Sequence, residues 1–231
     1  MLSILKTPML LCLGFRNINT ERAITLKRYL PLLCLLCSSL ASAEEWAFDM
    51  FLDKSKIGKH TFTLNNNTLT SRAKFNVKVL FINAYQYDHT SKEQWNNGCL
   101  TEIDVDTTED KVNTKVKGKK TANGFEISDG KKNQTLPACT MTFAYWNPKI
   151  LTQTKLLNPQ NAEYLDTVFE NLGNDNISVK GKPTETTHYK LKGALNGKNK
   201  LNIELWYNQK NEWVALKSTT PENYVITYKL I

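Results

Sequence analysis

The chain has 231 residues, with 30 Lys and Arg against 22 Asp and Glu, and a formal net charge of +8. Five of the basic residues and one acidic residue lie in the first 43 positions. Residues 44–231 therefore carry 25 basic and 21 acidic side chains, a formal net charge of +4. Lysines recur singly on the polar faces of expected strands, a pattern that keeps sheets soluble. The composition therefore gives little support to nucleic-acid binding.

The first 43 residues are predicted to be a targeting segment and not part of the fold. Lys27 and Arg28 precede the apolar run YLPLLCLLCSSL, which leads into Ala41-Ser42-Ala43, the small-x-small pattern that a signal peptidase needs. We predict cleavage after Ala43 and export of the remaining chain. The run is shorter than the about 20 apolar residues that span a bilayer, so we expect no stable membrane anchor after cleavage.

A second apolar stretch, MLLCLGF, lies upstream of this signal and leaves alternatives open. A signal that begins near Leu26 would be compact and basic at its start, which suggests that translation begins later than residue 1. The other possibility is an N-terminal membrane hairpin. A lipid anchor is disfavoured, because Leu33 and Leu36 precede Cys34 and Cys37 where lipid attachment requires a small residue.

Residues 44–231 are expected to form one domain dominated by antiparallel strands. Apolar and polar residues alternate strictly in many short segments, which predicts strands with one buried and one wet face. These segments are EWAFDMFL, HTFTL, LTSRAKFNVKV, KVNTKVK, KLNIELWY and YVITYKL. Turn signals such as NNN, NNG, SDG and NGKN separate them. We predict an all-β fold with minor α content, either a strongly curved antiparallel sheet or a half-open β-barrel with a short helical plug.

The strand YQYDHTSKEQW, residues 85–95, has an unusual face. One side carries Tyr85, Tyr87, His89, Ser91, Glu93 and Trp95. This mixture is typical neither of a purely apolar core face nor of a face exposed to solvent. Such a face is typical either of the aromatic floor of a ligand site or of the boundary between core and solvent, where Tyr and Trp bury rings and keep a polar atom bonded. The sequence leaves both interpretations open.

Cys99 and Cys139 are the two cysteines left after cleavage, and an even pair in an exported chain predicts a disulfide. The segment from Cys139 to Asn158 is expected to hold a helix of one or two turns before Pro148, the candidate plug. The segment AEYLDTVFENLG, residues 162–173, has helical spacing of its apolar residues, with Gly173 as a natural stop.

A catalytic interpretation would use His89 as a base with Glu93 or Tyr87 as its partner. Residues i and i+4 of a strand lie about 13 Å apart, so His89 and Glu93 cannot form a triad without help from other strands. A metal site would have to gather His60, His89 and His188 from distant strands, with no Cys or carboxylate cluster at ligand spacing. We therefore expect no metal and no cofactor.

Several stretches together resemble a family of uncharacterised bacterial proteins that are exported to the periplasm and known only as a domain of unknown function. They are WAFDMFLDKSKIGKHTF, FNVKVLFINAYQYDHTSKEQWNNGCL, CTMTFAYWNPKIL, LLNPQ and LNIELWYNQKNEWVALKS. The resemblance implies a Gram-negative periplasmic setting and favours strand over helix for residues 166–172. The chain differs from this family at Ala162, where a Gly is typical of the family. The closing segments are similar, more loosely, to half-open β-barrels that carry lipoproteins.

The sequence thus predicts a non-enzymatic periplasmic protein that binds a hydrophobic or amphipathic ligand, such as a lipid, or shields an envelope protein. The alternatives are an envelope hydrolase that uses His89, and a purely structural interaction module. The residues predicted to contact the ligand are His60, Tyr85, Tyr87, His89, Glu93, Trp95, Tyr145 and Trp146.

Overall fold

The computed structural model describes residues 43–79, 82–220 and 223–231, and the side chains of residues 78–84 are left out of the description. The predicted signal segment lies outside the described residues except for Ala43. Fourteen strands account for most of the described chain. Their bounds are β1 Glu44–Leu52, β2 Ser55–Asn65, β3 Thr68–Val79, β4 Ile82–Asn96, β5 Cys99–Glu109, β6 Val112–Thr121, β7 Gly124–Ser128, β8 Asn133–Leu136, β9 Lys155–Leu157, β10 Tyr164–Val179, β11 Lys182–Leu195, β12 Lys198–Asn208, β13 Trp213–Thr219 and β14 Val225–Leu230.

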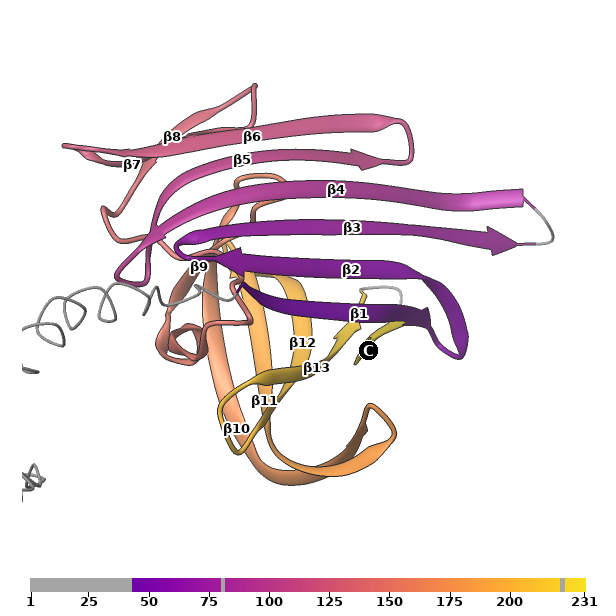
Figure 1. Ribbon diagram of the computed structural model, residues 1–231. Coiled ribbons are helices and arrows are strands. Elements are labelled where there is room, and N and C mark those ends of the chain that lie inside the picture. Colours follow the sequence, from indigo (N-terminus) through magenta and orange to yellow (C-terminus); the bar gives the residue numbers. More distant parts are fainter. Residues whose placement is uncertain (1–42, 80–81, 221–222) are drawn as a thin grey trace, which may run out of the picture. The chain divides into compact units, whose positions relative to one another are not determined.

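All fourteen strands belong to one antiparallel sheet in the order β8-β7-β6-β5-β4-β3-β2-β1-β14-β13-β12-β11-β10-β9. Neighbours in the order are neighbours in the chain, except where β1 pairs with β14, with Phe48 opposite Leu230. Figure 1 shows β2 to β6 running alongside one another and crossing β10 to β12 steeply, as expected of a twisted sheet that curls. Among the described strands, β8 and β9 end the order without pairing with each other, so the sheet is not closed. The predicted all-β, barrel-like architecture is confirmed.

The strands form where the sequence alternates. On β3 the side chains of Leu69, Ser71 and Ala73 are buried, while the intervening Thr70 and Arg72 are exposed. Tight turns connect the strands where the sequence has Asn-Gly. Asn97 and Gly98 both have positive φ angles, 53° and 83°, which is the backbone that a two-residue hairpin turn with the native twist requires.

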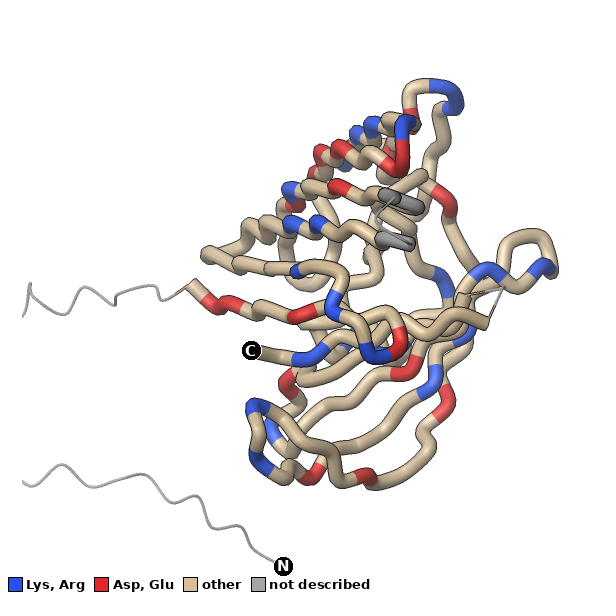
Figure 2. The backbone as a smooth tube through the Cα atoms, turned by 90° about the vertical axis from the view of Figure 1, so that its right-hand side faces the viewer, with Lys and Arg blue, Asp and Glu red and all other residues tan. Residues whose placement is uncertain are grey.

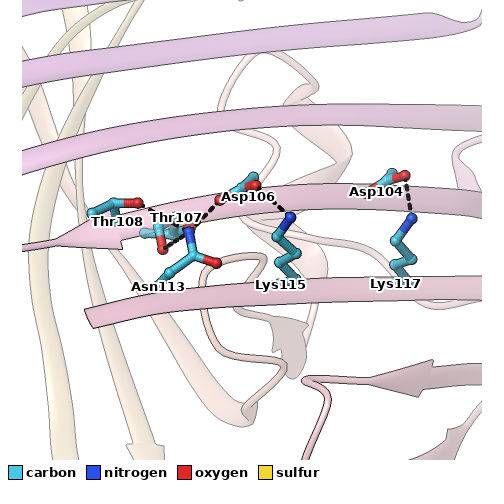
Figure 3. A network of polar contacts seen from close by, with 7 residues as sticks. All are labelled: Asp104, Asp106, Thr107, Thr108, Asn113, Lys115 and Lys117. Atoms are coloured by element: carbon cyan, nitrogen blue, oxygen red, sulfur yellow. Dashed lines mark hydrogen bonds and ion pairs between the residues drawn. The ribbon is translucent and has the colours of Figure 1, made fainter. Parts of the chain in front are cut away.

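The exposed face of the N-terminal strands carries paired charges. Asp104 and Asp106 on β5 lie directly opposite Lys117 and Lys115 on β6, with O to N distances of 3.0 and 3.2 Å. Figure 3 shows these pairs beside Asn113, which donates to Asp106. Figure 2 shows acidic and basic residues interspersed over the described backbone. Opposite charges placed across a strand pair favour this register over a shifted one.

The segment of residues 137–154, hereafter the strap, crosses the concave side of the sheet. Its helical content differs from the prediction: no helix precedes Pro148, and a 3-10 helix runs instead over Pro148–Thr152. Proline is well tolerated in the first turn, where its missing N–H has no partner to lose, and the Asn147 side chain accepts from the Lys149 N–H. The predicted plug is thus mostly irregular backbone.

The strap is fastened to both halves of the sheet. The predicted disulfide is confirmed, because Cys139 is bonded to Cys99 at the start of β5. Leu100 N donates to Thr140 O at 2.9 Å. On the other side, the Tyr207 hydroxyl of β12 donates to the carbonyl of Tyr145 at 2.8 Å.

The helix expected over residues 162–173 from spacing alone is wrong, and the strand implied by the family resemblance is correct. These residues enter β10, which pairs with β9 and β11. Leu165 is fully buried, whereas Val168 and Leu172 are 66% and 45% exposed, so pairing with two strands overrides the helical spacing even though it leaves part of the apolar stripe exposed. Ala162 has φ 58°, a left-handed backbone that explains the Gly expected there.

Candidate functional site

A hollow of about 270 Å³ lies on the concave side of the sheet. Its walls come from β1 to β4, from β12 to β14, from the strap, and from residues 158–160 between β9 and β10. Most of its lining is apolar, with aliphatic side chains from both halves of the sheet. The aromatic residues that line it are Phe62, Phe75, Tyr85, Tyr87, Phe143, Tyr145, Trp146 and Tyr228.

The unusual face of β4 looks into this hollow. Tyr87, His89, Ser91 and Glu93 all line it and are between 2% and 7% exposed. The alternation of a strand explains their common direction, because every second side chain points to the same face. Tyr85 also lines the hollow and donates to Glu109 at 2.5 Å at the more exposed end.

The structure brings seven of the eight predicted contact residues to the hollow, since His60, Tyr145 and Trp146 also line it. Trp95 is the exception. It shares the buried face of Glu93, to which its Nε1 donates, but lies further along β4 and packs at a steep angle against Trp146, with ring centroids 5.5 Å apart. Trp95 lies instead along an outer recess that shares Trp146 with the hollow.

Glu93 is a buried carboxyl with three hydrogen-bond donors and no cationic partner among the described residues. Its Oε2 accepts from Trp95 Nε1 and Thr142 Oγ1, both at 3.1 Å, and its Oε1 accepts from Ser91 Oγ at 3.2 Å. Burial raises the pKa of Glu93 to about 7, against the opposing effect of the three donors, which favour the charged form. The Thr142 bond also ties the strap to β4.

Two histidines line the same hollow in their neutral forms. Burial lowers the pKa of His60 to about 3, helped by the nearby His89, and burial lowers the pKa of His89 to about 4. His60 Nε2 lies 2.7 Å from Ser71 Oγ, and its Nδ1 lies 3.4 Å from the Tyr228 hydroxyl. His89 Nδ1 lies 2.8 Å from Thr107 Oγ1. These contacts pair three of the four ring nitrogens, while Trp146 Nε1 in the same lining is buried without a hydrogen-bond partner in the described part of the chain.

The hydrogen bonds do not assemble the catalytic pairs considered from the sequence. His89 bonds with Thr107, Glu93 bonds with Ser91, Trp95 and Thr142, and the rings of Tyr87 and His89 are stacked with centroids 6.0 Å apart. The pair of His60 and Ser71 has the distance of a base and a nucleophile. A histidine with a pKa of about 3 is, however, a weak proton acceptor at neutral pH.

His188, the third histidine, lies away from this site. It stacks on Trp206 with ring centroids 4.3 Å apart and bonds with Glu204 at 2.9 Å. Within the described ranges, no three His, Cys, Asp or Glu side chains are placed to share a metal ion. Nor does any helix among those residues have the length and hydropathy needed to cross a membrane.

Sequence reasoning missed the wall that comes from the C-terminal strands, and on the strap it found Tyr145 and Trp146 but not Thr142. Thr142 bonds with Glu93, and Tyr228 approaches His60 from β14. Leu201 and Ile203 on β12 and Ile226 on β14 complete the apolar surface. Their alternation marked them as one face of a strand, but no sequence signal showed that this face meets β2 to β4.

Comparison with known proteins agrees with the fold. Residues 48–231 match the family described as a domain of unknown function (DUF6134). No curated protein matches the chain. A solved structure from Brucella abortus, a beta-barrel-like protein of the domain of unknown function DUF1849, superposes with a TM-score of 0.62 at 12% sequence identity, over 83% of this chain and 96% of that one. The resemblance to an uncharacterised family with a barrel-like fold is confirmed.

Proposed function

We propose that this chain, which belongs to the family defined by the domain of unknown function DUF6134, binds a small hydrophobic or amphipathic molecule in the hollow of its curved sheet without acting as an enzyme. The observation that carries the proposal is the hollow itself: a largely apolar and aromatic wall with a few convergent polar groups at His60, His89 and Glu93. Ligand sites in proteins share this composition.

The size of the hollow limits what it can hold. Its 270 Å³ lies just below the range of about 300–1000 Å³ typical of small-molecule pockets. A single alkyl chain or a compact amphiphile fits this volume better than a whole lipid with two chains. Tyr145 and Tyr228, both only half-buried, line the hollow and offer polar atoms beside their rings.

We place this function in the periplasm, where a cleaved signal ending at Ala43 would deliver the chain. The bond between Cys99 and Cys139 supports an oxidising compartment, because such bonds persist outside the cytosol. An envelope lipid or an envelope protein that presents an apolar group is the kind of partner this setting offers.

The test is to purify residues 44–231 gently and measure the mass under native conditions, then to titrate the protein with the uncharged fluorescent probe N-phenyl-1-naphthylamine. We expect a co-purified small molecule or saturable probe uptake. Ala73 lines the hollow and is 2% exposed, so Ala73→Met should fill it and weaken probe binding roughly tenfold, equivalent to about 1.4 kcal/mol.

The matched control is Lys74→Met, on the opposite face of the same strand, where the side chain is 82% exposed. It adds the same residue outside the hollow and should leave probe binding unchanged. Empty protein that takes up no probe, or equal effects of the two substitutions, would refute binding in the hollow and leave a structural interaction module.

A further inference from the structure

The hollow contains no fixed positive charge. Among the described residues that line it there is no Lys and no Arg, and the ionisable groups other than tyrosines are Glu93, His60 and His89. The lysines of β2 to β4 that could be near, such as Lys59 and Lys74, are exposed on the other face of the sheet. An anionic group drawn into the hollow would therefore find no partner for its charge.

We infer that the hollow selects amphiphiles whose polar end is an uncharged hydrogen-bonding group, an alcohol or an amide, and rejects carboxylates and phosphates attached to the same chain. This inference rests on the proposed binding function and adds the chemistry of the polar end. It follows from the placement of Glu93, from the state of the two histidines and from the cost of burying a charge without a partner.

Glu93 offers the position that a ligand O–H or N–H would occupy. Its Oε2 already accepts two hydrogen bonds, from Trp95 and Thr142, whereas its Oε1 accepts one, from Ser91. A carboxyl oxygen has two lone pairs, so Oε1 can accept one more hydrogen bond from a group in the hollow. A carboxylate or phosphate brings no such donor when ionised, so it can bond with Glu93 only where that carboxyl is protonated and donates.

The histidines do not compensate for the missing cation. His60 and His89 are neutral near pH 7 because burial lowers the pKa of each. One nitrogen of His60 is already within hydrogen-bond distance of Ser71, and one nitrogen of His89 is already within that distance of Thr107. An ionised headgroup would lose its hydration and gain at most neutral donors such as Trp146 Nε1, a buried atom of the lining with no hydrogen-bond partner among the described residues, and burial of a charge without a cation is costly.

An ammonium group is a separate case, because Glu93 can meet it. Burial raises the pKa of Glu93 to about 7, so near neutrality about half of this carboxyl is ionised and able to pair with an amine. The inference therefore concerns anionic head groups, for which the described lining holds no Lys or Arg. An alcohol suits either state, because it can donate to Oε1 or accept from a protonated carboxyl.

The test displaces N-phenyl-1-naphthylamine from residues 44–231 at pH 7 with three compounds of one chain length: decan-1-ol, decanamide and decanoate. We expect the alcohol and the amide to displace the probe at concentrations roughly tenfold lower than decanoate. Failure of the probe and of all three compounds to bind would refute the proposed function. Equal displacement by all three, or tighter binding of decanoate, would leave that function standing and overturn this inference.

A substitution at the mouth supplies a second measurement. Gln160 lines the hollow and is exposed, so Gln160→Lys should fold normally and place a cation beside the entrance. Binding of decanoate should strengthen several-fold while binding of decan-1-ol stays the same. Thr61→Lys, exposed on β2 and absent from the lining, is the matched control and should change neither. Unchanged decanoate binding in Gln160→Lys would count against a charge-based rejection.

Discussion

Acidification from pH 6.5 to 5 is expected to destabilise the folded chain. Two buried histidines in the hollow lower the free energy of unfolding over this interval, and one buried carboxyl, Glu93, raises it. The pKa values of His60 and His89 fall from 6.5 to about 3 and about 4, so the unfolded chain takes up their protons first and stability is lost as the pH falls below 6.5. The pKa of Glu93 rises from 4.5 to about 7, so the folded chain takes up that proton first and gains stability over the same interval.

The three contributions can be compared directly. Each group changes the free energy of unfolding by a similar amount between pH 6.5 and 5, between about 1 and 2 kcal/mol, negatively for each histidine and positively for Glu93. The wild-type chain should therefore lose about as much as one histidine contributes. Glu93→Gln removes the compensating term and should lose about 3 kcal/mol, whereas His89→Gln removes one opposing term and should lose about 0 kcal/mol.

The assay is urea denaturation of residues 44–231 followed by tryptophan fluorescence, at constant ionic strength and at four pH values over this interval. The difference in free energy between pH 6.5 and 5 is the readout, so a uniform loss of stability in a variant does not affect the comparison. Exposed carboxylates such as Asp106 and Asp175 contribute equally to all three proteins. The same pH dependence in wild type and Glu93→Gln would refute a buried, largely protonated Glu93.

Three further outcomes are expected. Replacing both Cys99 and Cys139 by Ser removes a bond that closes a 40-residue separation and should lower the free energy of unfolding by about 4 kcal/mol; a melting temperature equal to that of the oxidised wild type would contradict this. Ala162→Val places a β-branched side chain at φ 58° and should destabilise by about 2 kcal/mol or more, whereas Ala162→Gly should stay within about 1 kcal/mol, as thermal melts can check. Exchanging the charges of Asp104 and Lys117 together should restore the stability that Lys117→Glu alone loses, about 0.2–1 kcal/mol in low salt; a double-mutant cycle with no coupling would exclude a role in register.

The strands could be predicted because period-two alternation is a local property. Leu69, Ser71 and Ala73 are buried as their spacing indicated, and Asn-Gly turns occur where the sequence has them. The helix expected over residues 162–173 failed because Val168 and Leu172 have helical spacing but no surface to cover, a fact that depends on β9 and β11. Spacing alone does not contain that information.

The site could be predicted only in part, for the same reason. The face of β4 carried its own signal in Tyr87, His89 and Glu93. Its partners did not: Thr142 is 49 residues away from Glu93 along the chain, and Tyr228 is 168 residues away from His60. Alternation also does not show where along β4 the hollow ends: Trp95 is on the buried face with Glu93, yet it packs against Trp146 outside the lining.

The fastening of the strap at two points has a mechanical consequence. The bond from Cys99 to Cys139 holds it to β5, and the Tyr207 hydroxyl holds it to β12, two strands that stand far apart in the sheet order. The strap therefore acts as a cross-brace that sets how far an unclosed sheet can spread. Any guest wider than the resting hollow must stretch or break this brace, so its fastenings act as a size limit on what the sheet can admit.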